Sequence, residues 1–141
     1  PDVSWAPVLV TYGANNRSAM LRLPPNRYCI ENRAPDMSVN PYLAAALQLA
    51  AGLDGIEQEM DPGEPLNDNL YLRSKKEIRK AGIEFLPGTL LHAIEAFDSD
   101  PFVDGVFGEM KDIYVEQKMM EWEKQFYTIY DQQREDRLTF V

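Results

Sequence analysis

The sequence has 141 residues, of which 45% are hydrophobic and 26% charged, values typical of one globular domain and unlike those of a peptide or a disordered tail. Its formal net charge of -9 argues against binding to nucleic acid or to an anionic membrane. The single cysteine, Cys29, and the single histidine, His92, exclude an internal disulfide and a zinc cluster of Cys and His within these residues. No stretch approaches the roughly 18 consecutive apolar residues that cross a bilayer, and the first residues lack the pattern of a secretion signal. The sequence therefore predicts a cytoplasmic protein.

Charge is distributed unevenly along the chain. Residues 1–60 carry four basic and six acidic side chains, net -2, whereas residues 61–141 carry ten basic and 17 acidic ones, net -7. The four cations of the first part are all arginines: Arg17, Arg22, Arg27 and Arg33. A guanidinium is a permanently charged planar fork that binds carboxylate or phosphate oxygens in pairs. This cluster favours a site for an anionic ligand, with ordinary surface positions or ion pairs as the alternative.

The chain first forms three extended segments. They are predicted at residues 8–12, 18–23 and 28–33, with a turn at residues 13–16. Side chains alternate along a strand, so Arg22 lies on the face opposite Leu21 and Leu23, and Glu31 and Arg33 point to the same side. A carboxylate beside a guanidinium is either part of a site or a surface ion pair worth under about 1 kcal/mol when exposed.

Helical patterns dominate the rest of the chain. Asn40 and Pro41 start a helix that is predicted to be buried and to run to about residue 60, with Gly52 and Gly55 inside it. Residues 67–76 are polar and predicted to lie on the surface. Three further helices are expected: one capped by Thr89, a short one over residues 100–108, and one from residue 109 to about residue 130, whose methionines and aromatic residues are predicted as core. The fold class is therefore α+β, with strands in residues 1–36 and mainly helix in residues 37–141.

Several short motifs follow one another in a specific order. They are Asn16-Arg17-Ser18-Ala19, then Arg22, Ile30-Glu31-Asn32-Arg33-Ala34-Pro35-Asp36, Asn40-Pro41-Tyr42-Leu43-Ala44 and Ala51-Gly52-Leu53-Asp54-Gly55-Ile56. Each is weak alone, but together they resemble the C-terminal third of the glutamine synthetase family. The resemblance covers nearly the whole chain and is firmest up to about Tyr71. The last thirty residues, with Glu121-Trp122-Glu123 and Arg137-Leu138-Thr139-Phe140, look more like relatives that ligate amines other than ammonia.

The resemblance implies that residues 1–141 are the C-terminal portion of a larger catalytic domain. Family members use ATP and two or more Mg²⁺ or Mn²⁺ ions to join glutamate to ammonia, or to a small amine, through a γ-glutamyl phosphate intermediate. They assemble as homo-oligomeric double rings. Because most metal-binding glutamates of the family lie upstream, the resemblance also implies that this portion is inactive alone.

The family's functional residues match four positions. Glu31 matches a glutamate that binds the second divalent metal ion, and Arg33 matches the arginine that holds the substrate glutamate and its phosphorylated form. Arg17 matches the catalytic arginine that neutralises charge on the phosphate during transfer, and Arg22 the one that lies against the ATP phosphates. Phosphoryl transfer depends mainly on positioning and charge neutralisation, which suits guanidinium groups and metal ions.

Two positions depart from the family or match it only locally. Many relatives carry basic residues that reach the nucleotide where this chain has Tyr28 and Cys29, with Arg27 further back. Tyr71 stands where some bacterial relatives are adenylylated; the alternative is an exposed structural tyrosine.

Two alternatives remain open for the function. One is a ligase for another amine, a γ-glutamyl-amine synthetase. The other is a catalytically silent structural or interaction relative, against which the presence of all four motif residues argues.

Overall fold

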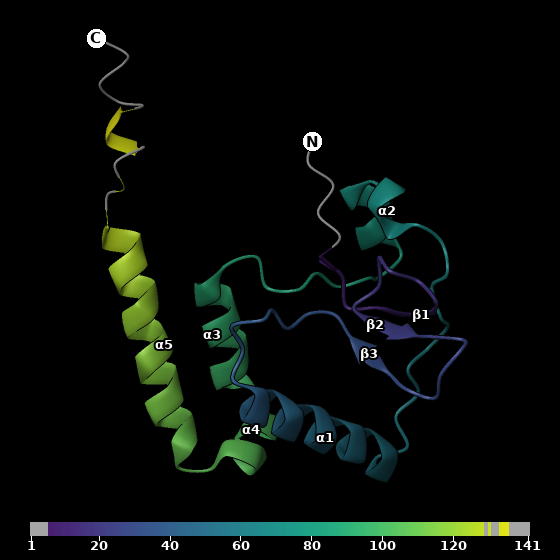
Figure 1. Ribbon diagram of the computed structural model, residues 1–141, viewed down its shortest axis with the longest axis horizontal. Helices are drawn as coiled ribbons and strands as arrows, with labels where there is room; N and C mark the ends of the chain where they lie inside the picture. The colour runs from purple at the N-terminus through teal and green to yellow at the C-terminus, as the bar shows by residue number, and fades with distance from the viewer. Residues whose placement is uncertain (1–5, 129, 131–132, 136–141) are drawn as a thin grey trace. The chain divides into compact units, whose positions relative to one another are not determined.

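The computed structural model describes residues 6–128, 130 and 133–135 (Figure 1). It divides into two compact units, Pro1–Leu86 and Pro87–Val141, which are described separately. In the described residues the first unit contains β1 (Tyr12–Ala14), β2 (Leu21–Leu23), β3 (Glu31–Asn32), α1 (Pro41–Glu57), a 3-10 turn η1 (Leu70–Leu72) and α2 (Lys75–Lys80), and the second contains α3 (Leu90–Ser99), α4 (Pro101–Phe107) and α5 (Met110–Tyr127). A small sheet followed mainly by helices confirms the predicted α+β class.

The three strands form one sheet in the order β1-β2-β3. β2 pairs with β3 in antiparallel fashion, and Arg22 lies opposite Glu31. β1 pairs with β2 in parallel, and it begins at Tyr12, so the strand predicted at residues 8–12 is displaced toward the C-terminus. The cause is a long-range contact, because Val10 N donates to Glu84 O at 2.9 Å and Leu86 N to Val8 O at 2.9 Å.

The link between β1 and β2 is unusually short for a parallel pair, which ordinarily needs a crossover of a dozen or more residues. Residues 15–20 form this link, and two backbone features accompany it, one at Asn15 and one at Gly13 in β1. Asn15 has a φ of 55°, in the left-handed region that asparagine tolerates better than most residues. Gly13 leaves no room for a side chain, since a Cβ there would lie 2.1 Å from Leu66 O.

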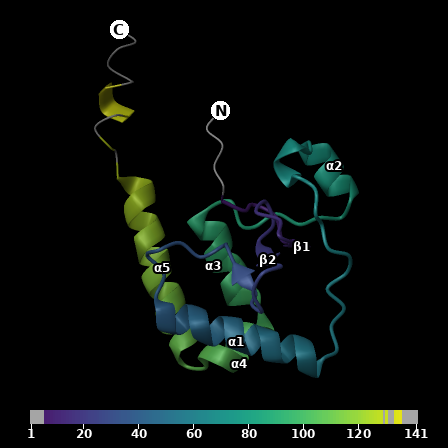
Figure 2. The ribbon, with the colours of Figure 1, turned by 45° about the vertical axis from the view of Figure 1, so that its right-hand side comes forward.

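Helix α1 begins as predicted and ends three residues early. Asn40 Oδ1 accepts from Tyr42 N at 3.0 Å, Pro41 occupies the first turn, and the helix continues through both glycines to Glu57. The prediction that it is buried is wrong: none of its residues is buried, and Tyr42 is 84% and Ile56 74% exposed. Burial of an apolar helix requires a partner surface, and the described residues cover this helix only in part, leaving residues such as Leu43 and Leu47 half-buried. An extended loop joins α1 to β3 (Figure 2).

The core of the first unit lies between chain segments far apart in sequence. Leu9, Leu70 and Ile78 are buried together, with Leu66 and Ile83 packed against them. Residues 67–76 were expected at the surface, yet Leu70 is only 2% exposed and anchors this segment. The segment therefore connects the core to the loop that carries Arg17.

In the second unit, α3 and α5 lie side by side (Figures 1 and 2). Thr89 Oγ1 caps α3 by accepting from His92 N at 3.2 Å, and Gly108 ends α4 with a φ of 50°. Phe97, Phe107 and Tyr114 pack together, with the Phe97 and Phe107 ring centroids 5.0 Å apart.

The prediction that the methionines and aromatic residues of α5 form core is confirmed only in part. Tyr114 packs against α3 and α4, but Met110, Ile113, Phe126 and Tyr127 are exposed. The helix ends at Tyr127, before the predicted end near residue 130. Residues 129 and 137–140, which also entered the predictions, lie outside the described residues. Among the described helices, none is both long and apolar enough to span a membrane.

Candidate functional site

The residues predicted to form the site line one pocket. A hollow of about 340 Å³ in the first unit is lined by Arg17, Arg22, Glu31 and Arg33. They come from the β1–β2 link, from β2, from β3 and from the residue that follows β3. Short strands and a tight loop therefore bring together side chains that lie as many as 16 positions apart in the sequence.

Arg22 and Glu31 form the centre of the pocket. The sheet register places them opposite each other, and Arg22 Nη1 donates to Glu31 Oε1 at 3.1 Å and to Oε2 at 2.9 Å. The Arg22 side chain is only 13% exposed. Its other terminal nitrogen, Nη2, donates to Asn15 Oδ1. The guanidinium is thus held through both of its terminal nitrogens.

Glu31 accepts from a second arginine as well. Arg27 Nη2 donates to Glu31 Oε1 at 2.5 Å. The hydrogen bond from Arg22 is the largest influence on the pKa of Glu31 and lowers it; partial desolvation, the next largest, opposes this shift. The charges of Arg22 and Arg27 and the hydrogen bond from Arg27 lower the pKa further, so that it lies below its ordinary value. Glu31 is therefore ionised at neutral pH. Three guanidinium groups and one carboxylate line the pocket, so its net charge is +2, which suits an anion.

Arg17 is exposed between two buried polar residues, Asn16 and Ser18. Asn16 Nδ2 donates to Leu66 O at 2.7 Å and to Asp68 O at 2.9 Å, and Asn16 Oδ1 accepts from Ser18 N at 2.9 Å. Leu70 N donates to Ser18 Oγ at 3.0 Å, so both neighbours of Arg17 are attached to the segment that carries the buried Leu70. The position of Arg17 therefore depends on residues about fifty positions away.

Arg33 follows β3 directly and is half-buried. Its backbone N donates to Met20 O at 2.9 Å, which continues the pairing of β2 and β3 by one residue. The prediction that Glu31 and Arg33 face the same side agrees with their shared place in the pocket lining. The ion pairs that Glu31 forms in the structure are with Arg22 and Arg27.

Two residues at the site have contacts that the sequence did not predict. Arg27 was recognised as part of the arginine cluster, but not as a partner of Glu31. Asn15 was placed only in a turn, and nothing in the sequence pattern indicates that its side chain contacts Arg22. Tyr28 and Cys29 are exposed and do not line the pocket.

The pocket offers a divalent metal ion only part of what it needs. Glu31 is the single carboxylate in its lining, and no group of three or more His, Cys, Asp or Glu side chains in the described residues could hold a metal ion. Hard cations such as Mg²⁺ take oxygen ligands, so Glu31 fits as one of them. The other ligands of such an ion would have to come from residues outside this part of the chain.

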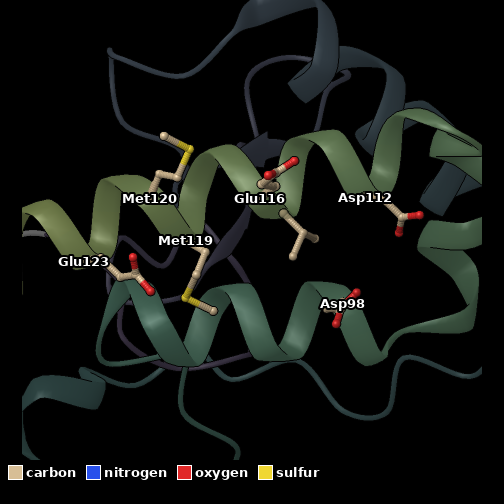
Figure 3. A pocket seen from close by; sticks show the side chains of 7 residues that line it. Asp98, Asp112, Glu116, Met119, Met120 and Glu123 are labelled. Carbon is tan, nitrogen blue, oxygen red and sulfur yellow. The ribbon is translucent and has the colours of Figure 1, made fainter.

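A groove in the second unit has the opposite charge. About 480 Å³ in volume, it lies along α3 and α5, with Met119 directed toward α3 and Met120 away from it (Figure 3). Its lining comprises four carboxylates and three apolar side chains: Asp98, Asp112, Val115, Glu116, Met119, Met120 and Glu123. Its charge disfavours phosphate, and it contains none of the predicted site residues.

Tyr71 lies in η1 and is half-buried, not exposed as expected. Its hydroxyl donates to Ala6 O at 3.1 Å, a contact that crosses most of the first unit in sequence. This contact is consistent with a structural tyrosine.

Comparison with known proteins finds close relatives of this chain. A family model described as the glutamine synthetase catalytic domain matches residues 2–136. A glutamate–methylamine ligase from Methyloversatilis universalis is 45% identical over 119 residues, which cover 84% of this chain and 26% of that protein. A glutamine synthetase from Thermus thermophilus is 42% identical over 129 residues, which cover 89% of this chain and 29% of that protein.

Solved structures give the same result. A GmaS–ADP complex superimposes with a TM-score of 0.82 at 37% identity, covering 96% of this chain and 30% of that one. The structure of GmaS without ligand superimposes with a TM-score of 0.79, also at 37% identity, covering 94% of this chain and 30% of that one. The chain thus spans between a quarter and a third of the length of these relatives. The match of nearly every residue to the family model shows that the chain belongs to the glutamine synthetase family.

Proposed function

We propose that this chain is the C-terminal portion of the catalytic domain of an ATP-dependent ligase that joins glutamate to ammonia or to a small amine. The observation that carries the proposal is the pocket itself: Arg17, Arg22, Glu31 and Arg33 converge in one hollow with a net charge of +2. The reaction proceeds in two steps. A γ-carboxylate oxygen of glutamate attacks the terminal phosphorus of ATP and ADP leaves. The amine then attacks the acyl carbon, inorganic phosphate leaves, and the nitrogen releases a proton to solvent to give the amide.

Each arginine has a separate task in this scheme. Arg22, held by Glu31 and Asn15, binds ATP phosphate oxygens in a fixed orientation. The exposed Arg17 neutralises the charge that develops on the transferred phosphoryl group. Arg33 holds the glutamate and its phosphorylated form. All three arginines keep their charge at any physiological pH, so binding does not depend on their protonation.

Glu31 would supply one oxygen ligand to a Mg²⁺ or Mn²⁺ ion, with the remaining ligands coming from outside this chain. Such an ion polarises phosphate oxygens and neutralises their charge. The lowered pKa of Glu31 keeps this carboxylate ionised and available as a ligand. The same carboxylate orients Arg22, so it couples the proposed metal position to the phosphate-binding arginine.

The amine substrate is the second part of the proposal. Relatives named glutamine synthetase and glutamate–methylamine ligase match this chain at 40–45% identity, and the amine ligase has the highest identity of those compared. This similarity favours a γ-glutamyl-amine synthetase as an alternative to a glutamine synthetase. The complete enzyme is proposed to act in the cytoplasm as a homo-oligomeric double ring.

The proposal is tested with a complete enzyme that carries this chain. Phosphate release from ATP is measured with glutamate and Mg²⁺, first with ammonia and then with methylamine. We expect glutamate-dependent turnover with one of the two amines and, for Arg33→Ala, a loss that appears chiefly in the KM for glutamate. No glutamate-dependent phosphate release with either amine, or normal glutamate dependence in Arg33→Ala, would contradict the proposal.

A further inference from the structure

Asn15 contacts the central arginine of the pocket, although no motif includes it. Its side-chain Oδ1 accepts a hydrogen bond from Arg22 Nη2, while Arg22 Nη1 bonds both oxygens of Glu31. We propose that Asn15 is a positioning residue, which sets the orientation of the Arg22 guanidinium for phosphate. This inference rests on the proposed function, because it concerns the phosphate-binding task of Arg22.

The backbone holds Asn15 in place on both sides. Asn15 N donates to Leu23 O at 2.9 Å, and the preceding Ala14 N donates to Asn67 Oδ1 at 2.8 Å. The next residue, Asn16, is buried and bonded to the backbone of residues 66 and 68. The backbone of Asn15 is therefore anchored, and from this position its exposed side chain reaches Arg22.

The left-handed backbone limits which residues can do this. Asn15 has a φ of 55°, which glycine adopts freely, asparagine and aspartate tolerate, and other residues adopt at a cost. Asparagine is the member of this group that offers a neutral side-chain acceptor. The amide oxygen orients the guanidinium without cancelling its charge, whereas an aspartate would lower the net charge of the pocket.

Two anchors on different nitrogens determine the plane of the guanidinium. Both bonds to Glu31 come from Nη1, so Glu31 by itself leaves the guanidinium group free to rotate about Nη1. The bond to Asn15 constrains Nη2, which still has a second hydrogen for a phosphate oxygen. The plane of the guanidinium determines the direction in which this remaining hydrogen meets a phosphate oxygen. Loss of the Asn15 acceptor should therefore impair the reaction more than it impairs folding.

Asn15→Gly is the decisive variant, since glycine keeps the left-handed backbone and removes only the acceptor. Glu59→Gly is the matched control, because Glu59 is the other described non-glycine residue with a positive φ, at 51°, and it does not line the pocket. In the complete enzyme we expect Asn15→Gly to lower kcat/KM for ATP about tenfold, and Asn15→Asp to restore kcat while raising the KM for ATP. Glu59→Gly should leave both constants unchanged, and neither glycine variant should lower the thermal unfolding midpoint.

Arg22→Ala and the double variant separate this inference from the proposed function. Arg22→Ala should lower kcat/KM for ATP about a hundredfold, and adding Asn15→Gly should cause no further loss. Normal activity of Arg22→Ala would overturn the proposed role of Arg22. An impaired Arg22→Ala with a normal Asn15→Gly, or a double variant whose loss is the product of the two single losses, would overturn the positioning role of Asn15 alone.

Discussion

The two hollows of this molecule differ in charge and in the way their walls are held. The pocket of the first unit has three guanidinium groups and one carboxylate, carried by short strands and a tight loop. The groove of the second unit has four carboxylates and three apolar side chains, carried by the neighbouring helices α3 and α5. The pocket walls depend on hydrogen bonds to residues 66–70, far along the chain, whereas the groove depends on helix packing.

An anion site needs several cationic side chains that point to one place. A regular helix surface presents its charges in a row. In the first unit, the left-handed backbone of Asn15, the buried amide of Asn16 and the close backbone approach at Gly13 bring the arginines together. Such a site is sensitive to its backbone anchors. We expect the groove to tolerate changes in single side chains, because its residues stand on α3 and α5, whose backbone hydrogen bonds do not depend on any one side chain.

The largest expected effect is on catalysis in the pocket. In a complete enzyme, Arg17→Ala should lower kcat about a hundred- to a thousandfold, since it removes a positive charge beside the transferred phosphoryl group. Arg79→Ala is the matched control, because Arg79 is an exposed arginine on α2 that does not line the pocket. Steady-state phosphate release measures both, and an Arg17→Ala enzyme as active as Arg79→Ala would remove Arg17 from the site.

A backbone change beneath the pocket should have the next largest effect. Gly13→Ala would place a Cβ 2.1 Å from Leu66 O, and relief of this clash should cost about 2–3 kcal/mol in the free energy of unfolding. Gly52→Ala, in α1, meets no atom within 4 Å and should stabilise by about 0.5–1 kcal/mol. Urea unfolding measures both values. Equal effects of the two substitutions would show that the close approach at Gly13 is not required.

A change at the start of a groove helix should cost stability and leave the pocket intact. Thr89→Ala removes the side-chain acceptor that caps α3, and should lower the free energy of unfolding by about 1 kcal/mol. Thr89→Ser keeps the acceptor and should restore the lost stability. The KM for ATP should stay unchanged in both variants; an altered value in Thr89→Ala would show that the two regions are coupled.

The smallest effect concerns protonation of Glu31. Its pKa lies below the ordinary value because Arg22 and Arg27 hydrogen-bond to it. A depressed pKa in the folded state stabilises the fold above the ordinary pKa of glutamate, and this contribution is lost as the pH falls through the folded value. Arg22→Ala should raise the Glu31 pKa, as measured by carboxyl carbon NMR titration. A Glu77 carboxyl, whose pKa is lowered by Ser74 instead, should not move.

Residues of the candidate site could be predicted from the sequence, whereas several of their contacts could not. Arg17, Arg22, Glu31 and Arg33 stand in motifs, and strand alternation places Glu31 and Arg33 on one side. The pairing of Arg22 with Glu31 depends on the register between two strands, which alternation within one strand does not determine. The contact of Asn15 depends on a left-handed backbone that a turn pattern does not specify.

The fold could likewise be predicted where it depends on neighbouring residues, but not where it depends on contacts between distant segments. Helix starts at Asn40 and Thr89 follow from local capping chemistry and were confirmed. The first strand was displaced because residues 8–10 pair with residues 84–86, a contact that no local pattern contains. The burial of α1 was predicted wrongly, since its apolar composition indicates a need for a partner surface but not where that surface lies.

Two carboxylates test most directly whether the pocket of the first unit, and not the groove of the second, is the reaction site. Glu31 lines the arginine pocket and Glu116 the acidic groove, and each can be changed to alanine in a complete enzyme that carries this chain. We predict that Glu31→Ala abolishes phosphate release from ATP in the presence of glutamate and Mg²⁺, and that Glu116→Ala releases phosphate at the unaltered rate. Unchanged turnover in Glu31→Ala would contradict the assignment of the pocket as the reaction site.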